Sequence, residues 1–148
     1  MISPCLIFNL PKLRKILYVD DQIDILLFAE YALTDIGDYE TLMCDSGKKA
    51  LNQIEQFKPD LILLDVMMPE LDGPTTLSLI RKFEAFKNTP AIFITAKILS
   101  NEVSELLSCD AKVIKVIPKP FDPIKISESI QAIWDSYFSK IDIEEVRD

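Results

Sequence analysis

Residues 60–69 read Asp-Leu-Ile-Leu-Leu-Asp-Val-Met-Met-Pro, and this stretch decides the fold. Four consecutive aliphatic residues, 61–64, lie between two aspartates. Such a run is typical of a central strand in a parallel sheet, because helices cover both of its faces. A carboxylate at the end of so apolar a strand is costly to bury unless it is used. The stretch therefore predicts a buried parallel strand that ends in a functional aspartate, Asp65.

Four further β-rich runs accompany this strand, at residues 15–20, 39–44, 91–95 and 113–117. Between the runs, apolar residues recur at steps of three and four, the period of amphipathic helices. These residues are Leu26, Ala29, Leu33 and Ile36; Ala50, Ile54 and Phe57; Leu77, Ile80 and Phe83; Leu99, Val103 and Leu106; and Ile126, Ile130, Ile133 and Tyr137. Asp122, before Pro123, is the predicted N-cap of the last helix. The alternation predicts an α/β fold, a doubly wound five-stranded parallel sheet with five helices.

Composition narrows the class of protein. The 148 residues are 49% apolar and 27% charged, which fits one globular domain. The net charge of -8 argues against direct binding to nucleic acid. The chain contains no histidine, which excludes a Ser-His-Asp triad, a histidine-ligated metal and a histidine phosphodonor. Three scattered cysteines and a short apolar N-terminal fragment predict a cytoplasmic protein without membrane insertion.

Polar residues follow the predicted strands at their carboxyl ends. Asp20 and Asp21 end the first strand, Asp65 the third and Thr95 the fourth, and the fifth runs into Lys119. In an open α/β sheet these ends form one rim, where ligands bind. Three converging carboxylates repel one another unless a cation compensates, and oxygen ligands favour Mg²⁺. A divalent metal, an ammonium and a hydroxyl around a carboxylate are what phosphoryl transfer requires.

These residues resemble the receiver domains of two-component response regulators. The matching pieces, from about Leu13 to Ser136, are Asp20-Asp21, Asp65-Val66-Met67-Met68-Pro69, Asp72-Gly73, Thr95-Ala96 and Lys119-Pro120-Phe121. Each motif alone is weak, but their order and spacing together are specific. The resemblance implies a flavodoxin-like sheet with the strand order 2-1-3-4-5.

The resemblance also implies a role for each site residue. Asp65 is the expected phosphoacceptor for a histidine kinase or histidine phosphotransfer protein. Asp20, Asp21, Asp65 and the backbone carbonyl of Met67 are expected to hold Mg²⁺. Lys119 is expected to contact the phosphoryl group, Thr95 to move toward it, and the Lys119–Pro120 peptide to be cis. The chain would then catalyse its own phosphorylation and dephosphorylation without being an enzyme for another substrate.

Two features depart from the common pattern of the family. Val116 stands where many relatives place an aromatic residue that is coupled to the hydroxyl switch. Lys112 and Lys115 replace residues that are often small. Together with Lys97 they either form a basic patch for an acidic partner or are solvated lysines that protect a sheet edge.

The expected organisation is an N-terminal extension (1–12), a receiver domain (13–138) and an acidic C-terminal tail (139–148), which is expected to be frayed from Ile141 onward. We expect a stand-alone receiver that signals through contact with a downstream protein. Two other functions are open: an Mg²⁺-dependent phosphohydrolase working through an aspartyl phosphate, and a pseudo-receiver scaffold. The phosphohydrolase would need an Asp-x-Asp motif after the first strand and a cap, and neither is evident. The intact set of site residues argues against the scaffold.

Overall fold

The computed structural model describes residues 10–96 and 99–147. Its five strands form one parallel sheet in the order β2-β1-β3-β4-β5, as predicted. The strands are β1 (Lys15–Val19), β2 (Glu40–Cys44), β3 (Leu61–Asp65), β4 (Ala91–Thr95) and β5 (Val113–Pro118). The helices are α2 (Ile23–Glu30), α3 (Gly47–Phe57), α4 (Gly73–Ile80), α5 (Ser100–Ser108) and α6 (Ile126–Arg147), with the short helices η1 (Tyr31–Ile36) and η2 (Glu84–Phe86).

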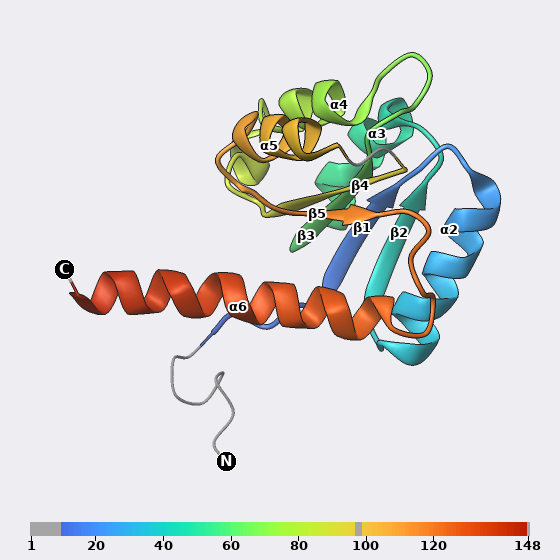
Figure 1. The fold of residues 1–148 in the computed structure, drawn as a ribbon. Helices are drawn as coiled ribbons and strands as arrows, with labels where there is room; N and C mark the ends of the chain where they lie inside the picture. Colours follow the sequence, from blue (N-terminus) through green and yellow to red (C-terminus); the bar gives the residue numbers. More distant parts are fainter. Residues whose placement is uncertain (1–9, 97–98, 148) are drawn as a thin grey trace.

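Helices cover both faces of the sheet (Figure 1). Helices α2 and α6 pack on one face, and α3 and α4 pack on the other. Successive residues of β1 serve the two layers in turn: Tyr18 joins the first core cluster, and Leu17 and Val19 join the second. Every residue of β3 and of β4 is buried. The continuous apolar runs therefore mark central strands, as the sequence indicated.

Two apolar residues on predicted helix faces, Ile36 and Leu99, are exposed in the structure. Ile36, predicted to be buried, is 43% exposed, because α2 continues as the π-helix η1 and the wider turn rotates the later residues. Leu99 is 63% exposed, and no residue of α5 is buried. Helix α5 packs against β5, which is an edge strand, so only part of its surface meets the sheet.

The last helix is longer than predicted. Helix α6 runs to Arg147 and extends beyond the sheet, so the expectation of a frayed tail from Ile141 is wrong for the backbone (Figure 1). The segment 139–147 contains neither glycine nor proline, and nothing in it stops a helix. Trp134 is buried and donates a hydrogen bond from Nε1 to the carbonyl of Pro11 (2.8 Å). Residues 1–9 of the expected extension lie outside the described residues. Among those described, no helix is both long and apolar enough to cross a membrane.

The loop between β5 and α6 carries two predicted features. The Lys119–Pro120 peptide is cis, as the resemblance implied. Asp122 Oδ1 accepts a hydrogen bond from the backbone N–H of Ile124 (2.9 Å). The carbonyl of Asp122 also accepts from Ile126, the first residue of α6. Asp122 therefore starts the last helix, one turn before the regular α-helical segment.

Candidate functional site

The strand ends bring the predicted polar residues together. Asp20 directly follows β1, Asp65 and Thr95 are the last residues of β3 and β4, and Lys119 directly follows β5. The backbone N–H of Lys119 donates to the carbonyl of Thr95 (2.8 Å), which ties the β5 end to the β4 end. Strand β1 lies between β2 and β3, so the chain order reverses here and opens a crevice at the carboxyl ends.

Three carboxylates form an acidic cluster at this crevice. Asp20, Asp21 and Asp65 each offer an oxygen atom, and these atoms lie within 4.8 Å of one another. Asp20 is fully buried and Asp65 is 4% exposed, whereas Asp21 is exposed. Oxygen donors at this spacing fit a hard divalent cation such as Mg²⁺, which binds carboxylates and keeps some of its waters. The exposed side of the cluster would leave room for those waters.

Lys119 supplies the positive charge of the cluster. Its Nζ lies 2.7 Å from Asp20 Oδ2 and 3.3 Å from Asp65 Oδ1. It also donates to Gln22 Oε1 (3.1 Å). The Lys119 side chain is 8% exposed, so these contacts are weakly screened by water. One ammonium thus serves two buried carboxylates and leaves part of their charge uncompensated.

The electrostatics of Asp65 reflect this shortage of positive charge. Burial, followed by the nearby charge of Asp20, raises the pKa of Asp65 from 3.8 to about 6, although Lys119 opposes the shift. Burial and the same two carboxylates also raise the pKa of the Tyr18 phenol far above its ordinary value. Tyr18 therefore stays protonated at physiological pH, whereas the acid–base equilibrium of Asp65 moves toward neutrality.

The loop after β3 holds Asp65 by a close backbone contact. Gly73 donates from its N–H to the carbonyl of Val66 (2.8 Å). A Cβ on Gly73 would lie 2.4 Å from the backbone oxygen of Asp65, so a side chain does not fit there. Asp72 caps α4 by accepting from the Thr75 N–H (2.8 Å). The Asp72-Gly73 motif thus folds the loop back onto the strand that ends in Asp65.

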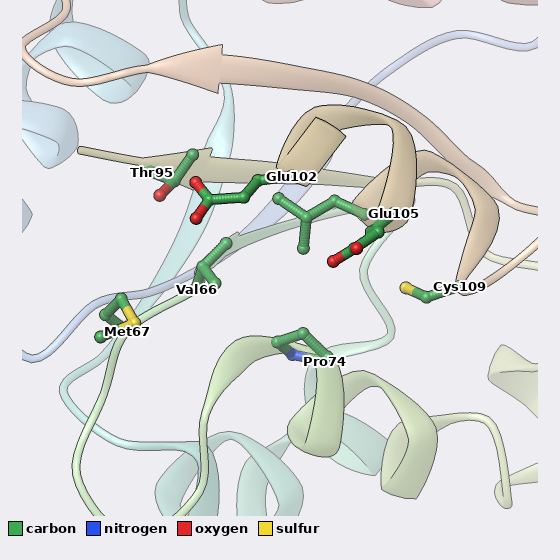
Figure 2. Close-up of a pocket in the computed structure, with 8 residues that line it drawn as sticks. Val66, Met67, Pro74, Thr95, Glu102, Glu105 and Cys109 are labelled. Atoms are coloured by element: carbon green, nitrogen blue, oxygen red, sulfur yellow. The ribbon is translucent and has the colours of Figure 1, made fainter. Parts of the chain in front are cut away.

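A cleft of about 330 Å³ opens beside the acidic cluster. Thr95, Val66, Met67 and the α5 residues Glu102 and Glu105 line it, and Figure 2 shows Glu102 next to Thr95. Met67 has an exposed side chain, and ligation of a metal by its carbonyl stays a prediction. The two glutamates add negative charge to an already acidic region.

Two residues with direct contacts to the cluster were missed by the sequence reasoning. Tyr18 Oη donates to Asp20 Oδ2 (3.2 Å), and the Gln22 N–H donates to Asp20 Oδ1 (2.9 Å). The position of Tyr18 could have indicated its contact, because residues two apart on a strand share a face. The role of Gln22 toward Lys119 had no signal in the sequence, since it depends on the β5–α6 loop reaching β1.

The residues that depart from the common receiver pattern, Val116, Lys115 and Lys112, lie on or directly before β5, an edge strand of the sheet. Val116 is partly buried on β5, pairs with Phe93 of β4 and packs on the second core cluster. Lys115 is exposed and Lys112 is partly buried, whereas Lys97 lies outside the described residues. The hypothesis of a basic patch therefore stays a prediction.

Fold and site together define a class of protein: a doubly wound α/β domain with an acidic, lysine-bridged crevice at the switch point of its sheet. Comparison with known proteins agrees. A family model described as the response regulator receiver domain matches residues 16–131. The chain belongs to this family.

Relatives and solved structures support the assignment. The chain is 34% identical over 120 residues to the alkaline phosphatase synthesis transcriptional regulatory protein PhoP of Bacillus subtilis, covering 81% of this chain and 48% of PhoP. It is 35% identical over 123 residues to the transcriptional regulatory protein BaeR of Escherichia coli, covering 83% and 44%. The structure of the Vibrio cholerae chemotaxis protein CheY4 matches with a TM-score of 0.73 at 28% identity, covering 82% of this chain and 99% of CheY4. The chain thus spans about half the length of the curated relatives it matches.

Proposed function

We propose that Asp65 accepts a phosphoryl group from a histidine kinase or a histidine phosphotransfer protein. The observation that carries this proposal is the grouping of Asp65 with Asp20, Asp21 and Lys119 at one rim of the sheet. Membership in the receiver family supports the same assignment. The 148 residues contain no histidine, so the phosphohistidine lies outside them.

The reaction transfers the phosphoryl group from a histidine nitrogen to a carboxylate oxygen of Asp65. An Asp65 carboxylate oxygen attacks the phosphorus of the phosphohistidine, so that an O–P bond forms while the N–P bond breaks and its electron pair returns to the imidazole. The product is an aspartyl phosphate. Water later attacks the phosphorus, the O–P bond breaks, and inorganic phosphate and the free carboxylate result. The chain therefore catalyses its own modification and does not turn over a separate substrate.

Each neighbouring residue has a role in this transfer. Asp20, Asp21, Asp65 and the carbonyl of Met67 would hold Mg²⁺, which when bound neutralises charge on the phosphoryl oxygens. Lys119, now shared by two carboxylates, gains the phosphoryl oxygens as a further partner. Thr95, buried at the end of β4, offers its hydroxyl from the adjacent strand. The transfer thus relies on charge stabilisation and positioning.

An exposed apolar surface lies beside the acceptor and suits the phosphodonor protein. We define the α2 surface as Ile23, Leu27, Phe28, Tyr31 and Ile124, each more than half exposed. Phe28 also lines a hollow of about 260 Å³ together with Lys119, so the surface continues into the site. Groups of exposed apolar side chains often mark interaction sites. A donor protein seated there could reach Asp65.

The output of the phosphorylated form is a contact with a downstream protein in the cytoplasm. Helix α5 is best suited to respond, because it has no buried residue and its Glu102 faces the cleft beside Thr95. The aspartyl phosphate carries about two negative charges where the free carboxylate carries one, so phosphorylation adds about one net negative charge next to this helix. Repulsion from Glu102 and Glu105 favours a displaced α5 in the phosphorylated chain, and this effect does not need an aromatic residue at Val116.

Intact-mass spectrometry after incubation with Mg²⁺ and a small acyl-phosphate donor tests the acceptor. We expect the wild type to gain one phosphoryl mass, which chelation of Mg²⁺ prevents and hydroxylamine removes. Asp65→Asn should gain none. Asp60→Asn is the matched control. Asp60 directly precedes β3, at the end of the strand away from Asp65, and its side chain accepts hydrogen bonds from the Arg14 and Lys15 N–H groups. Absence of the gain in wild type, or its survival in Asp65→Asn, would overturn the proposal.

A further inference from the structure

Tyr18 brings a hydroxyl into the apolar core between the sheet and the helices α2 and α6. It is fully buried on β1, paired with Met43 of β2 and Leu63 of β3. A buried hydroxyl is costly unless it is hydrogen-bonded. Its partner is Asp20 Oδ2, at 3.2 Å. The residue thus directs one polar atom from the core at a carboxylate of the site.

Three donors hold the Asp20 carboxylate, and they differ in how firmly they are fixed. Lys119 Nζ contacts Oδ2 but also contacts Asp65 and Gln22, so its position depends on what the site contains. The Gln22 N–H holds the other oxygen, Oδ1. Tyr18 is packed on all sides and can keep its hydroxyl on Oδ2 when Lys119 turns elsewhere.

We infer that Tyr18 is a positioning residue, whose hydroxyl orients the Asp20 carboxylate for Mg²⁺ and keeps it oriented when Lys119 moves to the phosphoryl group. The inference rests on the proposed function, because it assumes that Asp20 is a metal ligand. A neutral donor suits this task, since it fixes the carboxylate without adding a charge that competes with the cation. Groups that orient metal ligands in this way typically contribute about 10- to 100-fold to metal affinity or activity.

Isothermal titration of the metal-free chain with MgCl₂ alone tests this inference. We expect Tyr18→Phe to weaken Mg²⁺ binding by about tenfold or more, as the loss of an orienting hydrogen bond predicts. Tyr39→Phe is the matched control: it also removes a hydroxyl that donates to a side chain, Gln131 Oε1, but before β2 at the opposite end of the sheet. The control should bind Mg²⁺ like the wild type.

A second readout separates positioning from a merely structural role. The phosphorylation rate of Tyr18→Phe should fall at low Mg²⁺ and recover at saturating Mg²⁺, whereas a damaged fold would lower it at every concentration. If Tyr18→Phe does not fold, Tyr18→Met gives the same test with an adaptable apolar side chain. Equal Mg²⁺ affinity of wild type and a folded Tyr18 variant overturns the inference and leaves the proposed function intact. A wild type that binds no Mg²⁺ overturns both.

Discussion

Lys119 Nζ lies 2.7 Å from Asp20 Oδ2, although Asp20 follows the first strand in the sequence and Lys119 follows the last. The pair is almost fully buried, and the same ammonium also meets Asp65. Removing one partner of a buried ion pair leaves an uncompensated charge, whereas an exposed pair contributes little. The contact between the ends of β1 and β5 therefore makes the site a determinant of stability.

Lys119→Met should destabilise the metal-free chain by about 3–5 kcal/mol, because Asp20 and Asp65 lose their shared cation. Urea unfolding with a chelator present measures the change. Addition of Mg²⁺ should restore part of the loss, since the cation replaces the missing charge. Lys87→Met removes an exposed pair with Glu84 and should cost no more than about 1 kcal/mol. Similar losses in the two variants would contradict the buried-pair argument.

The raised pKa of Asp65 predicts a pH dependence of stability. The pKa is 3.8 in the unfolded reference and about 6 in the folded chain, so the folded state binds the proton more tightly. The stabilisation of the folded chain by this tighter proton binding is fully present below about pH 4 and is lost as pH rises through about 6. We expect metal-free wild type to lose unfolding free energy relative to Asp65→Asn between pH 4 and 7. Chemical denaturation across that range measures the difference, and parallel curves for the two proteins would refute the shift.

The α2 surface predicts selective loss of transfer from a protein donor. Leu27→Ala and Phe28→Ala should each slow phosphotransfer by about tenfold, which corresponds to a loss of about 1.4 kcal/mol of docking free energy for each residue. Their phosphorylation by a small acyl phosphate should stay at the wild-type rate, because the acceptor chemistry is untouched. The donor used is the phosphorylated histidine kinase that transfers fastest to wild type. Leu107→Ala, on α5, is a control with an exposed leucine off the surface.

The glutamates of the cleft predict an electrostatic effect on small donors. Glu102 and Glu105 line the cleft beside Thr95 and repel an anionic donor (Figure 2). Glu102→Gln/Glu105→Gln should raise the rate of phosphorylation by a small acyl phosphate several-fold at low ionic strength, and added salt should shrink the gain. Glu55→Gln, exposed on α3, should leave the rate unchanged. A gain that persists in high salt would point to a cause other than charge.

Much of the fold follows from residue order alone. The apolar run 61–64 is long enough to need cover on both faces, and it lies between segments of helical period, so a parallel α/β sheet was the consistent solution. The position of Asp65 in the acidic cluster was also predictable, because the carboxyl ends of parallel strands meet at one rim of the sheet. The exposed Ile36 and Leu99 were not predictable, because a π-helical turn and packing at a sheet edge override the three-four period.

The sequence by itself determined the strands, the helices and the identity of the polar residues at the strand ends, because these depend on local periodicity and residue chemistry. Only the tertiary structure decided that the Lys119 ammonium is shared between Asp20 and Asp65, and that Tyr18 points its hydroxyl at Asp20. It also decided that Gly73 approaches the Asp65 backbone too closely for any side chain. Such contacts join segments that are distant in the chain. Their geometry is set by how strands, loops and helices pack, which no local pattern records.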